Sequence, residues 1–279
     1  FDAFHKSRHR WITYNIDSRT VKITNKEQLQ EYVDDYGEDS DFVKVRVRGV
    51  FPSASAKQFI NREDVDAAMN RDVGQVNYSR TVAILGVDVA REGDDRSAIA
   101  TKIGRDCTMP LKVFRGLDGP QLGMQVLMYA NELKQKGIPR VYINLDYTGV
   151  GASPYDWLKD KVQHLNKVIS ASQSTNPQRW ANKRAEMWDK MRDFIRDDGV
   201  IPKSEELAED LCIPEKLIDQ KGRLLLESKD SMKRRGMNSP DTADALALCF
   251  AIPIQEYIED DSWRHQRINR HKGIRDPYA

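Results

Sequence analysis

The feature that most constrains the fold is a nearly unbroken apolar run that contains one acid near its end. Residues 82–89 read VAILGVDV, and the following loop, residues 90–97, reads AREGDDRS. An apolar run without polar alternation predicts a strand buried on both faces, as in the middle of an α/β sheet. The sequence therefore places a carboxylate, Asp88, at the end of its most buried strand, where an unpaired charge is costly.

The same arrangement appears twice more. Residues 140–146, RVYINLD, predict a strand that ends at Asp146. Residues 242–251, TADALALCFA, predict a helix that is apolar around most of its circumference but contains Asp244, and Asp241 lies one turn earlier. Clustered carboxylates repel each other, and divalent cations that prefer oxygen ligands make such a cluster tolerable. We therefore expect these acids to converge and to hold two Mg²⁺ or Mn²⁺ ions, which can clamp the attacking and leaving oxygens of a phosphodiester.

Each acid also has a structural explanation. Asp88 is at a position where aspartate often caps a turn, and Asp146 precedes a glycine-rich turn that it can stabilise. Asp241 suits the first turn of a helix, where a carboxylate interacts favourably with the helix dipole. Asp244 is harder to explain in this way, because an acid inside an apolar helix needs a partner. The acids of the loop are solvated on the structural interpretation; on the metal-site interpretation one of them, Asp95 in our assignment, reaches a second metal ion.

Composition restricts the class of protein. The chain has 279 residues with 44 Lys plus Arg against 43 Asp plus Glu, so any nucleic-acid surface has to be local. Its three cysteines form no Cys-x-x-Cys pair, which argues against a zinc site or a disulfide framework and suits a reducing compartment. We find neither a signal peptide nor an apolar run long enough to span a bilayer. Because the first residue is phenylalanine, we expect a fragment or a processed product.

The periodicity divides the chain into three parts. Residues 1–80 are polar and irregular, with a predicted hairpin around residues 17–18, a helix at 25–37, a strand at 42–52 and a short helix at 60–71. From residue 81, strands come first and then alternate with helices, which predicts a mixed sheet with helices on its faces. Its further elements are expected as strands at 97–103, 111–115, 167–171 and 222–227 and helices at 119–137, 154–162, 177–197 and 239–251, the last capped by Ser239. Residues 254–279 predict a basic, mobile tail.

Four segments resemble a known family. They read GVDVAREGDDRSAIA (residues 86–100), NLDYTGVGASPYDWL (144–158), NKRAEMW (182–188) and LLLESKDSMKRRGMNSPDTADALALCFA (224–251). In content and order they resemble the C-terminal nuclease domain of large terminase subunits of tailed bacteriophages, which belongs to the ribonuclease H-like superfamily. The resemblance implies a ribonuclease H-like mixed central sheet flanked by helices. It also implies an endonuclease that cuts concatemeric viral DNA during genome packaging.

By motif position, the resemblance also implies site residues. The family holds two divalent metal ions with three or four acids, which correspond here to Asp88, Asp146 and an acid of the last helix. That helix offers Asp241 and Asp244, and we favour Asp244 because the helix dipole explains Asp241 more simply.

The resemblance implies a domain organisation as well. The family's full-length protein carries an ATPase motor with a Gly-x4-Gly-Lys-Ser/Thr phosphate loop, whereas this chain contains no Gly-Lys pair. We therefore expect residues 1–80 to be the end of an ATPase domain with a linker, and residues 81–253 to be the nuclease domain, without ATPase activity in this chain alone. The implied partners are double-stranded DNA, the protein's own ATPase domain, the small terminase subunit and the portal ring, in the cytoplasm of an infected bacterium.

Duplex binding requires cations along the phosphate path. Six basic residues flank the proposed acids in sequence: Lys183, Arg184, Lys229, Lys233, Arg234 and Arg235. Lys229 can also tune the charge of the carboxylates, whereas a run such as residues 233–235 is equally well explained as a solvated face. Trp180, Trp188 and Tyr147 can stack on bases, but aromatic residues on an amphipathic helix are more often part of a core. No segment resembles a recognition helix, so we expect sequence-tolerant cutting.

Two other hypotheses remain open from sequence. In the first, GVDVAREGDD is the phosphate loop of an actin-like or sugar-kinase-like ATP-binding protein, with DYTGVG (residues 146–151) as its second phosphate turn. In the second, the chain is a non-catalytic DNA-packaging scaffold module, in which loss of Asp88 and Asp146 leaves function intact. Neither gives Asp244 a role, which favours the nuclease hypothesis.

Overall fold

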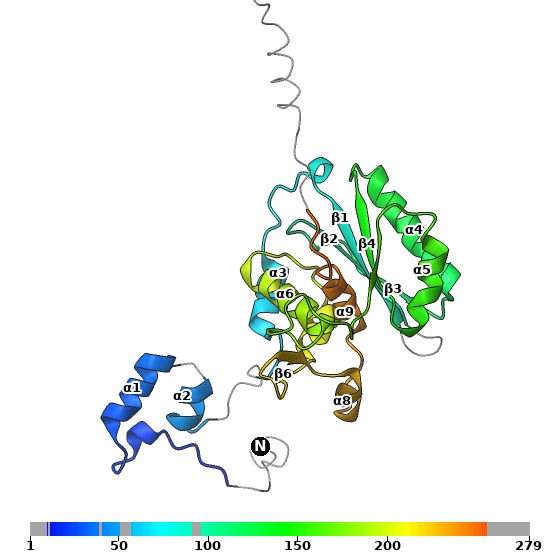
Figure 1. The fold of residues 1–279 in the computed structure, drawn as a ribbon. Coiled ribbons are helices and arrows are strands. Elements are labelled where there is room, and N and C mark those ends of the chain that lie inside the picture. The colour runs from blue at the N-terminus through cyan, green and yellow to red at the C-terminus, as the bar shows by residue number, and fades with distance from the viewer. Residues whose placement is uncertain (1–9, 11, 39–40, 51–56, 91–95, 256–279) are drawn as a thin grey trace, which may run out of the picture. The chain divides into compact units, whose positions relative to one another are not determined.

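The computed structural model describes residues 10, 12–38, 41–50, 57–90 and 96–255 (Figure 1). Asp95 and residues 256–279 of the predicted basic tail lie outside these ranges. The chain divides into two compact units, Phe1–Asn61 and Arg62–Ala279. The larger unit thus begins earlier than residue 81, because helix α3 (Arg62–Asn70) packs against helices α6 (Lys183–Asp197) and α7 (Glu205–Cys212).

The larger unit is built on a mixed five-stranded sheet with the strand order β3-β2-β1-β4-β5. Strand β1 (Ala83–Asp88) lies in the middle, antiparallel to β2 (Arg96–Ile103) and parallel to β4 (Val141–Asp146). At the edges, β3 (Lys112–Arg115) is antiparallel to β2, and β5 (Leu165–Val168) is parallel to β4. Every residue of β1 is buried, as the apolar run predicts. The predicted mixed α/β sheet is therefore confirmed.

Helices cover both faces of the sheet. Figure 1 places α4 (Gly119–Gln135) and α5 (Ala152–Leu158) on one side, and α3, α6 and α9 (Asp241–Leu248) on the other. Apolar side chains of β1, β4 and α4, such as Leu85 and Leu145, form the core on the α4 side. Among the described helices, none is long and apolar enough to cross a membrane.

Helix α9 lies directly on the backbone of β1. A Cβ added at Gly86 would lie 2.0 Å from the carbonyl oxygen of Ala245, so any side chain at this position would push the helix away. At the far end of the helix, the buried Asn144 side chain of β4 donates to the Leu248 carbonyl at 2.8 Å. The helix begins at Asp241 with Pro240 at the N-cap position, one residue later than the predicted cap at Ser239.

A small antiparallel pair of strands extends from this body. Strands β6 (Lys216–Ile218) and β7 (Leu224–Leu226) precede the short helix α8 (Lys229–Arg234). The buried carboxylate of Glu227 accepts hydrogen bonds from Ser231 Oγ at 2.8 Å and from Arg235 Nη2 at 2.6 Å. These contacts fix the start of α8, and hence of Lys229, relative to the end of β7.

The smaller unit contains a 3-10 turn η2 (Ser18–Thr20) and helices α1 (Lys26–Tyr36) and α2 (Asp41–Arg46). Helix α1 is confirmed in detail. Asn25 accepts hydrogen bonds from backbone N–H groups of the first turn, and Gly37, with φ 83°, ends the helix as predicted.

Two predictions for this unit are wrong. The segment expected as a hairpin around residues 17–18 contains the turn η2, and the segment expected as a strand at 42–52 contains the helix α2. Val43 and Val47 are four residues apart, and both are buried against Leu29. In a short segment that alternates valine with basic residues, this helical spacing outweighs the period-two pattern.

Candidate functional site

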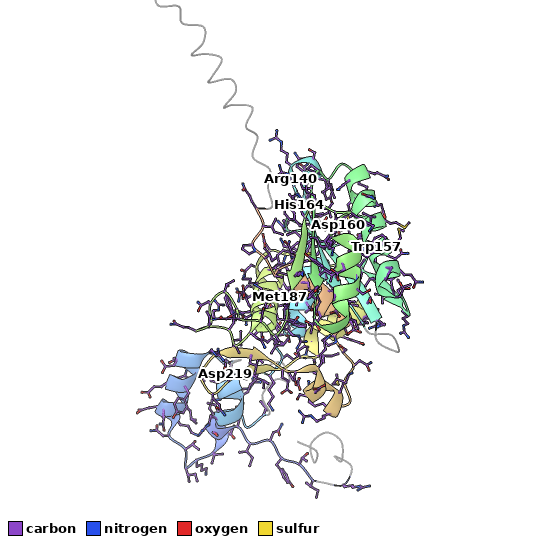
Figure 2. The ribbon with its side chains drawn as sticks, turned by 45° about the vertical axis from the view of Figure 1, so that its right-hand side comes forward. Arg140, Trp157, Asp160, His164, Met187 and Asp219 are labelled. Atoms are coloured by element: carbon purple, nitrogen blue, oxygen red, sulfur yellow. The ribbon has the colours of Figure 1, made fainter. Side chains whose placement is uncertain are left out.

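Four acids converge at the carboxyl end of the central strand. Asp88 ends β1, and Asp146 ends the adjacent parallel strand β4. Asp241 and Asp244 lie in the first turn of α9. All four line one cleft of about 900 Å³, whose α6 side includes Met187 (Figure 2). The structure therefore brings together the four acids that the sequence singles out.

Asp244 is held by three donors. The Trp188 indole N–H donates to Oδ1 at 2.8 Å, Arg184 Nη2 lies 3.1 Å from Oδ1, and Lys229 Nζ lies 3.0 Å from Oδ2. Burial alone would raise the pKa of this carboxyl, but the charges of Arg184 and Lys229 outweigh burial and lower the pKa to about 2. Asp244 is thus a fixed, ionised carboxylate in the first turn of its helix, and its partners come from α6 and α8.

Asp88 is in the opposite situation. It is 6% exposed, and Lys229 Nζ lies 3.8 Å from its Oδ2. Burial raises the pKa of Asp88 to about 7; Lys229 opposes this shift, and the negative charges of Asp244 and Asp146 add to it. The fold therefore builds a carboxylate whose charge it compensates only in part.

Asp241 lies between two cations at longer range. Lys229 Nζ is 3.8 Å from its Oδ1, and Arg96 Nε is 3.9 Å from its Oδ2. Burial raises the pKa of Asp241 by more than the hydrogen bond with Ser239 and the charge of Lys229 lower it. Like Asp88, this acid is buried, and within the described ranges its nearest counter-charge lies 3.8 Å away.

Asp146 is half-buried and is oriented by its own turn. Its Oδ1 accepts the Thr148 backbone N–H at 2.9 Å. The chain then turns through the 3-10 helix η5 (Gly149–Gly151), where a Cβ added at Gly151 would lie 1.8 Å from the Asp146 carbonyl oxygen. The glycine-rich segment after β4 thus closes tightly on the end of the strand and presents the Asp146 side chain to the cleft.

Lys229 is shared among three of the acids. Burial by itself would lower the pKa of its ammonium, but the charges of Asp244 and Asp88 raise the pKa above the ordinary value. Within the described ranges, no group of three or more acid, histidine or cysteine side chains is arranged to hold a metal ion as it stands. The lysine ammonium lies where the carboxylates meet. The donor set itself consists of carboxylate oxygens, the ligands that Mg²⁺ and Mn²⁺ prefer.

The six basic candidates fall into three groups. Lys233 and Arg234 are exposed on α8 and line the cleft, where a phosphate backbone can reach them. Three others are engaged within the protein: Arg184 with Asp244, Lys183 with Glu186 at 3.2 Å, and Arg235 with Glu227 at 2.6 Å. Lys229 lies among the acids. Among the six candidates, Lys233 and Arg234 are therefore the two that are exposed at the cleft.

Sequence reasoning missed the role of Trp188. The indole N–H is a donor to Asp244, whereas the sequence offered only base stacking or core packing for this residue. A signal was present, because the N–H of a fully buried tryptophan usually needs an acceptor. Arg184 and Trp188 are also four residues apart on α6, so they share one helix face. The contacts of Asp210 and Arg96 near α9 were missed as well.

No protein-family model and no curated protein matches the chain. Solved structures do match. The nuclease domain of the large terminase subunit gp2 of bacterial virus Sf6 covers 71% of this chain and 100% of its own, with a TM-score of 0.57 and 20% identity. A K428A mutant of that domain, solved with manganese, covers 70% and 100%, with a TM-score of 0.56 and 20% identity. The large terminase nuclease of thermophilic phage G20c, solved with cobalt, covers 70% and 96%, with a TM-score of 0.51 and 10% identity. These likenesses confirm the ribonuclease H-like fold of this chain.

Proposed function

We propose that this chain is a metal-dependent endonuclease that cuts double-stranded DNA, and that it is the nuclease domain of a large terminase subunit. The observation that carries the proposal is the partly compensated Asp88. Asp88 is buried, ends its strand beside three further acids, and lies 3.8 Å from Lys229, so a further cation would stabilise its charged form. The terminase nuclease domains that share the fold include one solved with manganese and one solved with cobalt.

Asp88, Asp146 and Asp244 are the acids that we assign to hold Mg²⁺ or Mn²⁺. Both oxygens of Asp244 have donors in the structure, and Oδ2 has two of them, Lys229 Nζ at 3.0 Å and Arg184 Nη2 at 3.3 Å. On this proposal Lys229 gives way to the metal ion at Oδ2. Arg184 and Trp188 keep the carboxylate in place during that exchange. Asp241 is the further candidate ligand, because it is buried and faces its cations only at longer range. Asp95 stays a proposal from the sequence.

Two divalent ions at such a site supply an activated water and stabilise the leaving oxygen of a phosphodiester. The residues of this chain do the rest. The carboxylates fix the position of the ions, and Lys233 and Arg234 bind phosphates along the rim of the cleft. Such cations contact the backbone of the duplex and not the base edges, so the cutting should tolerate many sequences.

The test is cleavage of supercoiled plasmid by this chain with Mg²⁺, with Mn²⁺ and with EDTA. Nicking and linearisation that require a metal are expected. Asp88→Ala, Asp146→Ala and Asp244→Ala, each shown to be folded by circular dichroism, should abolish both. Asp241→Ala in the same series distinguishes the two acids of α9.

Asp160→Asn is the control for this series. Asp160 is exposed and lies well away from Met187 at the cleft (Figure 2), so its loss should leave the cutting unchanged. Plasmid that stays intact with both metals would overturn the proposed activity. Cutting by the alanine variants at the wild-type rate would overturn the assignment of the acids.

We further propose that the nuclease works inside a larger packaging machine. On this proposal, residues 1–80 comprise the end of an ATPase domain and its linker, and the part of the linker from Arg62 packs on the nuclease unit. The tail from residue 254 contacts DNA or a partner. The portal ring and the small terminase subunit are the proposed partners, in the cytoplasm of an infected bacterium. The chain alone should not hydrolyse ATP, since it contains no Gly-Lys pair for a phosphate loop.

A further inference from the structure

Helix α9 carries two of the cleft acids, yet it begins without a cap of its own. Proline occupies its N-cap position, and no side chain there accepts a hydrogen bond from the first turn. The first turn of any helix leaves backbone N–H groups without an intrahelical partner. These groups are buried here, because all residues of the first turn are buried. Their partner therefore has to come from elsewhere in the fold.

For the Thr242 N–H, that partner is Asp210 of helix α7. Its Oδ2 accepts the Thr242 backbone N–H at 3.1 Å and the Thr242 hydroxyl at 2.6 Å. Asp210 is 5% exposed and lies 32 residues before Thr242 in the chain. Burial raises the pKa of Asp210 to about 6, although both hydrogen bonds from Thr242 oppose the shift. A buried carboxylate is thus kept at this position and makes both bonds through one oxygen.

A second connection holds the same turn. Arg96 of β2 forms an ion pair with Glu206, which also belongs to α7, and reaches Asp241 at 3.9 Å. Helix α7 is therefore linked to the first turn of α9 both directly and through β2. Asp241 directly precedes Thr242, and Asp244 follows it by two residues, so a shift of this turn would move both carboxylates.

We propose that Asp210 is a positioning residue of the cleft. Through Thr242 it caps α9 from a neighbouring helix and fixes the directions of the Asp241 and Asp244 carboxylates. The inference rests on the proposed metal-dependent nuclease. Its consequence is that Asp210, which does not line the cleft, controls how well the cleft acids bind divalent cations.

The test measures binding of Mn²⁺ alone to the chain, by titration calorimetry, together with the Mn²⁺ dependence of plasmid nicking. Asp210→Ala should raise the half-saturating Mn²⁺ concentration about tenfold, at the low end of the loss seen when groups behind metal ligands are removed. Asp210→Asn should stay near wild type, because one amide oxygen can still accept both bonds from Thr242. Glu209→Ala, at the exposed neighbouring position on α7, is the matched control and should behave as wild type.

A purely structural cap gives a different result. In that case Asp210→Ala lowers the melting temperature but leaves the Mn²⁺ dependence unchanged, which overturns the inference. Thr242→Val keeps the shape and the backbone N–H but removes the hydroxyl, so it provides the same comparison if Asp210→Ala does not fold. If Asp210→Ala and Thr242→Val nick plasmid at the wild-type rate and with unchanged Mn²⁺ dependence, the positioning role is overturned, but the proposed nuclease function stands. A wild-type chain that binds no Mn²⁺ and leaves plasmid intact overturns the proposed function and this inference with it.

Discussion

Helix α6 and the cleft both bury acids, and they neutralise them in different ways. Glu186 on α6 is fully buried, and its carboxylate accepts the Thr175 backbone N–H and hydroxyl, both at 2.8 Å. Lys183 and Lys190 also pair with this one carboxylate. Burial would raise the pKa of Glu186, but these partners together lower the pKa to about 2. Its neighbour Asp189 is likewise paired with two arginines.

In the cleft, several acids share one lysine, whereas on α6 two lysines pair with one acid. A single ammonium, that of Lys229, is shared by Asp88, Asp241 and Asp244. Among the described residues, Asp244 has Arg184 and Trp188 as close donors besides Lys229, whereas burial raises the pKa values of Asp88 and Asp241. Burial of an acid therefore does not by itself mark a site, because Glu186 is more buried than any cleft acid. What distinguishes the cleft acids from Glu186, among the described residues, is that they share few counter-charges.

The largest expected effect separates Asp244 from Glu186, whose pKa values are both lowered to about 2. Asp244→Asn should reduce the rate of plasmid nicking in Mn²⁺ by about three orders of magnitude. The bound metal is expected to stabilise the transition state by several kcal/mol, and each loss of about 1.4 kcal/mol slows the reaction tenfold. Glu186→Gln, assayed where it is folded, should keep the wild-type rate. Equal losses in the two variants would remove the distinction between the two regions.

The second prediction concerns stability and has the opposite order. Glu186→Gln should lower the free energy of unfolding by about 2–3 kcal/mol, below the usual range for breaking a fully buried ion pair because Lys190 is partly exposed. Asp88→Asn should leave the metal-free stability unchanged or raise it, since it removes a buried charge with little compensation. Urea unfolding in EDTA, followed by tryptophan fluorescence, measures both. A clear loss of stability in Asp88→Asn would mean that its charge is well compensated.

The two regions should also respond to pH in different ranges. The folded pKa of Asp88 lies above its ordinary value of 3.8, so the folded state keeps this proton longer and metal-free stability falls as pH rises from about 4 to about 7. Glu186 has a lowered folded pKa, so its stabilisation is present above about 4.5 and is lost as pH falls towards 2. One group contributes at most about 1.4 kcal/mol per pH unit.

Difference curves isolate these contributions, since Asp210, Asp241 and Asp244 titrate as well. The free energy of unfolding in EDTA should decline less between pH 4 and pH 7 in Asp88→Asn than in the wild type. It should lose part of its acid-side decline with Glu186→Gln. A wild-type curve parallel to that of Asp88→Asn over the upper range would contradict the raised pKa.

The comparison also explains what the sequence could reveal. The apolar run before Asp88 and the apolar helix around Asp244 are local patterns, and each shows that burying an acid there is costly. Their convergence was expected because shared divalent cations make a carboxylate cluster tolerable, and in the structure both acids line one cleft. Of the counter-charges, Lys229 was expected near the carboxylates and lies among them. The ion pair of Arg184 with Asp244 was not expected, because the two residues are 60 positions apart in the chain and no local pattern records such a contact. The link from Asp210 to Thr242 was missed for the same reason.

Where local patterns compete, the prediction fails for another reason. In the segment that forms α2, apolar and basic residues alternate in a way typical of a strand. The helical spacing is recorded by one pair of buried residues, Val43 and Val47. Whether this spacing or the alternation decides the structure depends on what the two valines pack against, here Leu29. Tertiary packing made that choice.

The next effect, about tenfold, concerns the shared ammonium. Lys229→Met should tighten binding of Mn²⁺ about tenfold, because a like charge a few ångströms away repels the ion by more than 1 kcal/mol even at the partly exposed edge of a protein. Lys190→Met removes a comparable charge from the α6 group and should leave Mn²⁺ binding unchanged. Titration calorimetry compares the two. Weaker binding in Lys229→Met would mean that the lysine chiefly orients the carboxylates.

The smallest expected effect is on duplex binding, and it compares a cation that is paired within the protein with cations that are exposed at the cleft. Lys233 and Arg234 are exposed at the cleft, whereas Lys190 is paired with Glu186. Lys233→Gln and Arg234→Gln should each weaken duplex binding a few-fold and reduce the slope of log affinity against log salt by about one. Lys190→Gln should leave that slope unchanged, because its charge is already matched within the protein. Binding of a fluorescent duplex, followed by anisotropy in Ca²⁺ at several salt concentrations, gives the slopes. If Lys190→Gln reduced the slope as much as the cleft variants do, counter-charge within the protein would not decide which cations bind DNA.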